Sequence, residues 1–202
     1  DGIGSKLAHQ VAAEAQSHIG MARRLATSSE VRSRRRETLM AALAISGVTS
    51  AVNTAERWLD IAKKDAEALT TERDSEEKTA MMRSLGLAPG DAIPANLKAD
   101  IRALEEGQKR RATRSVRDGL DRILVDLLSL YRDVLTLQIS ANVSLVNEDL
   151  RSGITEVANS STAAETIHKL EAIAEARIRI DSNVRDLMVL ESLAVQLRRK
   201  TA

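Results

Sequence analysis

The chain has 202 residues, of which 43% are hydrophobic and 29% are charged, and its formal net charge is +1. Without cysteine it can form no disulfide, thiolate metal site or thiol nucleophile, and its near-zero net charge provides no overall field for nucleic acid or an anionic membrane. Ala, Leu, Ile and Val supply the apolar character, and the few aromatic residues with abundant Ala, Leu, Arg and Glu favour helices. No apolar stretch approaches the ~20 residues of a membrane span. The lack of cysteine fits a cytoplasmic protein, which is the location we expect.

The N-terminal part of the chain is predicted to form short helices over 5–16 and 20–26. A third helix is expected over 28–46, ending where Gly47 interrupts the pattern. Because the sequence begins at Asp1 rather than at Met, we also expect it to be a fragment of a longer protein.

Two much longer helices are predicted next. Residues 48–85 contain no Gly or Pro, and their apolar residues recur at spacings of three and four or their sums. Gly86 can adopt the left-handed conformation that ends a helix. A second long helix is expected over about 95–139, and a short connection between two long helices predicts an antiparallel hairpin that turns near residues 89–94.

The hairpin is polar near its turn and apolar in the second half of its returning arm. We therefore expect the tip to project into solvent and the base to pack in a domain. With a turn centred near residue 90, Trp58 is predicted to be buried beside residues 121–127, where Ile123 or Leu124 would cover its ring.

The remaining helices are predicted at about 148–159, 162–182 and 184–199. Thr162 and Glu165 have the spacing of a capping box, in which each side chain bonds the backbone N–H of the other residue. No strand pattern is present, so the predicted fold is all-α, a helical bundle with a long antiparallel hairpin.

Glu165 and His168 have the Glu-x-x-His spacing of di-iron bundles, which need two such pairs and two further carboxylates. The chain has three histidines and no second pair, so a carboxylate-bridged metal enzyme is a weak hypothesis. No phosphate-binding loop, zinc motif or nucleophile motif is present either. We predict no catalytic residue, no cofactor and no metal site.

Two basic runs, residues 32–36 and 109–117, could contact phosphates. Several cations in or near these runs have an acidic residue four positions before them, which predicts an ion pair on the same helix face. The predicted pairs are Glu30–Arg34, Glu105–Lys109, Glu106–Arg110 and Asp118–Arg122. The second run is therefore expected to be a solvated helix face. The first is more open to a ligand, because Arg32, Arg35 and Arg36 have no obvious local partner.

The second half of the chain resembles a known family. The residues that carry the resemblance are Tyr131-Arg132-Asp133, Leu145-Val146-Asn147, and the stretch from Arg177 through Asn183-Val184 to Leu190-Glu191. Over about 115–200 this pattern resembles the C-terminal helical collar domain of bacterial clamp-loader subunits. Among these subunits it is most similar to the delta-prime type of the DNA polymerase III clamp loader, in its actinobacterial form.

The start of the chain, "AAEAQSHIGMARRLA", resembles the end of the small lid domain of an AAA+ module. The residues of this lid motif are His18, Gly20, Arg23 and Arg24. The resemblance implies that residues 1–30 end a lid domain whose nucleotide-binding domain would precede Asp1. Gly20 stands where ATPase subunits of the family carry a lid arginine that faces ATP, so ATP hydrolysis by this subunit is not expected.

The resemblance assigns residues 31–202 to a collar domain, with a hairpin insertion at about 69–113 that the family pattern does not explain. It implies partners: the gamma/tau ATPase subunits and delta, and, through the whole complex, the sliding clamp and primed DNA. The fragment itself would not be an enzyme, although the parent complex belongs to the DNA polymerase III holoenzyme, a DNA-directed DNA polymerase. The alternative is a free-standing helical coiled-coil adaptor that binds a protein through the hairpin tip.

The last two predicted helices carry more apolar residues than one face each can bury. Such a helix is either central in its own domain or shared with a partner. The clamp-loader resemblance favours a partner, and it implies a subunit interface that includes Ile180 together with Val189 or Val195.

Overall fold

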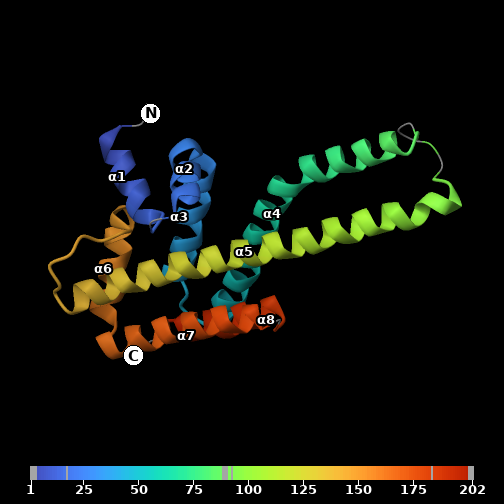
Figure 1. The fold of residues 1–202 in the computed structure, drawn as a ribbon. Coiled ribbons are helices and arrows are strands. Elements are labelled where there is room, and N and C mark those ends of the chain that lie inside the picture. The colour runs from blue at the N-terminus through green and yellow to red at the C-terminus, as the bar shows by residue number, and fades with distance from the viewer. Residues whose placement is uncertain (1–3, 17, 88–90, 92, 183, 200–202) are drawn as a thin grey trace. The chain divides into compact units, whose positions relative to one another are not determined.

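A computed structural model of the chain describes residues 4–16, 18–87, 91, 93–182 and 184–199 (Figure 1). In this part of the chain every regular element is helical, which confirms the predicted all-α class. The α-helices in chain order are α1 (Ser5–Glu14), α2 (Ile19–Thr27), α3 (Ser29–Leu43), α4 (Val48–Ser84), α5 (Lys98–Gln138), α6 (Arg151–Ser160), α7 (Ala163–Asp181) and α8 (Asp186–Leu197). Single 3₁₀ turns, η1 (Ala95–Leu97) and η2 (Glu148–Leu150), precede α5 and α6.

Two compact units divide the chain. The first contains residues 1–59 and 121–202, and the second contains residues 60–120. The predicted hairpin insertion, about 69–113, lies within the second unit. In the described part of the chain, no helix combines the length and the apolar character that a membrane crossing needs.

Helix ends follow from identifiable residues. Gly86 has a φ of +76°, its N–H donates to the carbonyl of Arg83, and the N–H of Leu87 donates to that of Met82 at 2.9 Å. These bonds form a Schellman motif, so the predicted end of the first long helix is confirmed. The predicted turn at residues 89–94 lies mostly outside the described residues.

The predicted capping box of α7 is also confirmed. The Thr162 hydroxyl accepts from the Glu165 N–H at 3.2 Å, and the Glu165 carboxylate accepts from the Thr162 N–H at 3.0 Å. The role of Glu165 in the Glu-x-x-His segment is thus structural. On α3, the predicted pair between Glu30 and Arg34 forms at 2.5 Å.

Trp58 lies in the core of the first unit, as predicted from the hairpin register. Its side chain is fully buried, and so is that of Leu124, while Ile123 is nearly so. The indole Nε1–H donates to the carbonyl of Thr38 on α3 at 3.3 Å. The pairing of the two hairpin arms does not predict this partner.

Helices α1 and α2 share a small apolar cluster formed by Val11, Ala15 and Leu25. This part of the chain also contacts the following helices, because Glu14 on α1 lies 3.6 Å from Arg35 on α3. The division between a lid domain and a collar at residue 30 stays a prediction.

In the second unit, the outer parts of α4 and α5 run side by side (Figure 1). A Cβ placed on Gly119 would lie 3.3 Å from that of Ala62, which shows how closely the arms approach. Farther out, Arg111 of α5 donates to Asp74 at 3.0 Å and also bonds Glu77, both on α4. This shared ion pair lowers the pKa of the Glu77 carboxyl, chiefly through its bond to Arg111.

Candidate functional site

Asp133 on α5 clasps the loop that follows this helix. Its carboxylate is fully buried and accepts from the N–H of Val146 at 3.1 Å. It also accepts from the backbone N–H and the side-chain amide of Asn147, at 2.7 and 2.8 Å, and from Arg132 at 3.2 Å. Asp133 and Asn147 belong to two separate motifs of the resemblance, so the structure brings these motifs together in one buried cluster.

Arg35 on α3 extends this cluster to three helices. Its Nη2 donates to the Asn147 side chain at 2.6 Å, and its Nε donates to the Asp126 carboxylate of α5 at 3.1 Å. Its Nη1 lies 3.6 Å from the Glu14 carboxylate of α1. Glu14, Arg35, Asp126 and Asn147 are all buried. The guanidinium therefore joins α1, α3, α5 and the loop before η2.

Two carboxylates share the positive charge of Arg35, and Arg122 supplies a second cation. Arg122 donates to Asp126 at 3.0 Å and to the backbone carbonyl of Glu14 at 2.8 Å. Burial raises the pKa of Asp126, while Arg35 and Arg122 oppose this shift. The cluster is arranged to hold helices together and offers no exposed nucleophile.

Asp126→Asn is expected to alter the pH dependence of stability. Because the folded-state pKa of Asp126 is raised, the folded protein binds more protons than the unfolded chain between ~3.9 and that raised value. The Asp126 carboxyl therefore makes the free energy of unfolding decrease as the pH rises between these two pKa values. The asparagine side chain does not titrate, so the variant should lack this decrease. Urea unfolding of both proteins from about pH 4 to about pH 7 measures the difference, and parallel profiles would contradict it.

The cations of the first basic run form hydrogen bonds and ion pairs within the chain. The expectation that this run is open to a ligand was therefore wrong. Arg32 donates to backbone carbonyls at the end of α2, Leu25 among them. Arg35 is part of the buried cluster, and Arg36 pairs with Asp149 at 2.6 Å. Partners distant in sequence thus replace the local partners that the run lacks.

The second basic run pairs differently from the prediction. Glu105 bonds Lys78 of the opposite hairpin arm at 2.7 Å rather than Lys109. Arg122 pairs with Asp126 instead of Asp118. The expected pairs Glu105–Lys109 and Asp118–Arg122 were wrong because Glu105 and Arg122 bind these other partners. The expected pair Glu106–Arg110 does not form in the described part of the chain either.

The residues of the lid motif lie on or next to α2. His18 is the N-cap of the helix, and its Nδ1 accepts from the N–H of Met21 at 3.2 Å. Arg23 is exposed, and Arg24 is half-buried. A Cβ on Gly20 would meet the His18 ring at 3.4 Å, an ordinary contact. The assignment of this motif to a lid domain stays a prediction.

Two residues expected at a subunit interface are buried within the chain itself. Ile180 is 2% exposed and Val189 is 3% exposed, while Val195 is half-buried. The apolar side chains that α7 and α8 present to solvent are different ones, such as Ile178 at 60% and Met188 at 59%. A partner that binds these helices would meet the exposed residues first.

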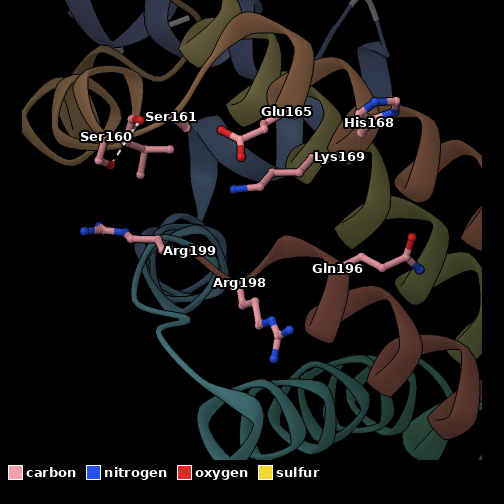
Figure 2. Close-up of a pocket in the computed structure, with 9 residues that line it drawn as sticks. Ser160, Ser161, Glu165, His168, Lys169, Gln196, Arg198 and Arg199 are labelled. Atoms are coloured by element: carbon pink, nitrogen blue, oxygen red, sulfur yellow. Dashed lines mark hydrogen bonds between the residues drawn. The ribbon is translucent and has the colours of Figure 1, made fainter. Parts of the chain in front are cut away.

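A cavity of about 440 Å³ lies beside α7 and the end of α8 (Figure 2). It is lined by Val157, Ser160, Ser161, Glu165, His168, Lys169, Gln196, Arg198 and Arg199. The buried Lys169 places its Nζ 5.3 Å from the centre of the Tyr131 ring, a cation–π contact. Burial raises the pKa of the Tyr131 phenol, which keeps it neutral.

Several polar groups of this cavity have structural partners. Glu165 caps α7, and Arg199 donates to Glu156 at 2.6 Å and to the carbonyl of Leu43 at 2.9 Å. Figure 2 shows the Arg198 side chain directed away from Lys169. The described residues also contain no group of three His, Asp or Glu side chains that could hold a metal ion. The prediction that the chain has no catalytic site remains a prediction.

Comparison with known proteins gives a partial match. The chain is 35% identical over 80 residues to DNA polymerase III subunit delta' of Bacillus subtilis (strain 168). Part of this chain is related to that clamp-loader subunit. The match covers 40% of the chain and 23% of the relative, so the chain spans less than a quarter of that protein. No known family profile and no solved structure matches the chain.

Proposed function

We propose that this chain is part of a clamp-loader subunit of the delta-prime type, and that its helical domain joins the subunit to its neighbours. The observation that carries the proposal is the 35% identity over 80 residues to DNA polymerase III subunit delta'. The buried cluster supports it, because Asp133 and Asn147, which carry the resemblance, hold the first unit together.

In this proposal the chain is a structural subunit in the cytoplasm. Its direct partners are the gamma/tau ATPase subunits and delta, and it reaches the sliding clamp and primed DNA through the assembled complex. The chain itself contributes no catalytic residue. Its share of replication is to hold a complex together.

Exposed apolar side chains near the connection between α7 and α8 offer a surface for a neighbouring subunit. Ile178 lies in the last turn of α7, Met188 lies in the first turn of α8, and Val184 lies between the helices, 41% exposed. These three exposed apolar side chains flank one helix connection, and exposed apolar surface is typical of protein interfaces. We therefore place the contact at these three residues, next to the buried Ile180 and Val189.

The double variant Ile178→Asp with Met188→Asp is expected to abolish co-purification with a co-expressed gamma/tau ATPase subunit. A buried aspartate without a partner opposes the interface, while the fold of the chain stays intact because both positions are exposed. Co-purification on a tagged ATPase subunit measures the effect. A circular-dichroism melt of the isolated chain checks that the variant folds.

Matched controls are available elsewhere on the surface. Ile139 and Val143 are 60% and 65% exposed, and aspartates at both positions should leave co-purification unchanged. Removal of residues 69–113 should also leave it unchanged, whereas a coiled-coil adaptor would lose its partner. Retention of the ATPase subunit by the Ile178/Met188 variant would rule out this interface. Failure of the unaltered chain to bind any clamp-loader subunit would contradict the proposed function itself.

A further inference from the structure

The second basic run forms an exposed cationic face on the α5 arm of the hairpin. Residues 107–117 contain five cations and no acidic residue. Arg111 turns inward and pairs with Asp74 and Glu77. Lys109, Arg110, Arg114 and Arg117 remain, and we call these four residues the cationic face. The first three are exposed, and Arg117 is half-buried.

Nearby carboxylates do not neutralise this face. Glu105, the expected partner of Lys109, is bound to Lys78 of the other arm. Glu77 and Asp74 are bound to Arg111. Glu106 borders the face, in a shallow hollow that it shares with Lys109, Arg110 and Thr113, and the exposed Asp118 follows its last cation. Within the described residues, no hydrogen bond or ion pair engages the four side chains of the cationic face. Four cations against two bordering carboxylates leave the face with a net positive charge.

We infer that the cationic face binds the phosphate backbone of duplex DNA. The face extends over residues 109–117, which is about 12 Å at ~1.5 Å per residue. Over that length one strand of a duplex presents three or four phosphates, since phosphates recur every ~3.4 Å along a strand. Three exposed cations and the half-buried Arg117 on one helix thus match the charge and the spacing of a single strand of the duplex.

The composition of the chain favours contacts with the DNA phosphate backbone over contacts with the bases. Single-stranded nucleic acid is bound largely by stacking on aromatic side chains, but the chain has no Phe, and its Trp58 and Tyr131 are buried in the other unit. Sequence readout needs side chains that pair with base edges in a groove, which a solvated row of Lys and Arg does not provide by itself. Binding through this face is therefore expected to be independent of sequence and strongly dependent on salt.

The test is a salt titration of full-chain binding to a fluorescently labelled duplex of mixed sequence, followed by anisotropy. The logarithm of the binding constant should fall with the logarithm of salt concentration with a slope of about −2.7 to −3.6, for three or four phosphate contacts. Arg110→Gln with Arg114→Gln should reduce the magnitude of this slope by about 2 and weaken binding at low salt at least tenfold. A second duplex of different sequence should bind with the same constant.

The matched control is Lys63→Gln with Arg83→Gln. It removes the same charge from exposed positions of the α4 arm and should leave the slope unchanged. Equal slopes for both double variants would overturn the inference, since net charge rather than this face would then drive binding. Absence of duplex binding by the unaltered chain at low salt, or preference for single strands, would overturn it as well. Sedimentation velocity tests for self-association of the chain. If the chain self-associates and the Arg110/Arg114 variant does not, the cationic face binds a second copy of the chain rather than DNA, which would also overturn the inference.

Discussion

Replacing Asp133 by alanine is expected to lower the free energy of unfolding by about 3–5 kcal/mol. The carboxylate accepts from both the backbone N–H and the side-chain amide of Asn147, and all these groups are buried. Each buried donor left without an acceptor costs about 1–3 kcal/mol, and alanine admits no replacement acceptor. Val146 and Arg132 lose partners too. Urea unfolding followed by far-UV circular dichroism measures the loss.

Asp121→Ala is the matched control for this variant. Asp121 is on the same helix and pairs with Arg177 at 2.7 Å, but its side chain is 48% exposed. A solvated ion pair of this kind contributes about 0–1 kcal/mol. A loss for Asp133→Ala no greater than that for Asp121→Ala would show that the clasp does not stabilise the protein.

Trp58→Ala is expected to cost about 3–5 kcal/mol, the range for large aromatic residues truncated in well-packed cores. The side chain is fully buried, so the substitution removes apolar contacts on every side and leaves a cavity. It also removes the donor to the carbonyl of Thr38. Thermal and urea unfolding by far-UV circular dichroism should both report the loss.

Trp58→Phe separates packing from the hydrogen bond. Phenylalanine keeps much of the apolar volume and lacks the N–H, so its cost should be well below that of alanine, with about 1 kcal/mol for the lost bond. An alanine variant as stable as the phenylalanine variant would contradict the view that packing around Trp58 stabilises the first unit.

Most helix boundaries could be predicted because local chemistry sets them. Gly86 adopts a positive φ at the end of α4, and Thr162 with Glu165 closes the start of α7. The burial of Trp58 followed from the spacing of two arms around one turn. Each of these features depends on near neighbours in sequence or on a single register, which a pattern of residues can specify.

The buried cluster could not be predicted, because its members are far apart in sequence. Arg35 bonds Asp126 and Asn147 across separations of 91 and 112 residues, and nothing near Arg35 in the chain indicates either partner. A weak signal exists in Asp126 and Asp133, two carboxylates within a mostly apolar stretch of α5. A charge in such a stretch indicates burial with a partner but does not identify the partner.

Apolar pattern also fails to separate core from interface. Ile178 and Ile180 are two residues apart on α7, and one is exposed while the other is buried. Hydrophobicity is the same at both positions, and the direction of each side chain relative to the rest of the unit decides the outcome. This is why the predicted interface residues lie beside the exposed ones rather than among them.

The placement of the two large aromatic side chains has a consequence for spectroscopy. Trp58 and Tyr131, the aromatic residues of the chain, both belong to the unit formed by residues 1–59 and 121–202, and residues 60–120 contain none. Intrinsic fluorescence therefore reports the first unit alone, while far-UV ellipticity reports the helices of both. If the hairpin unravels before the rest, ellipticity will decline while the emission maximum stays fixed, so the two signals resolve the order in which the units lose their structure without any added label.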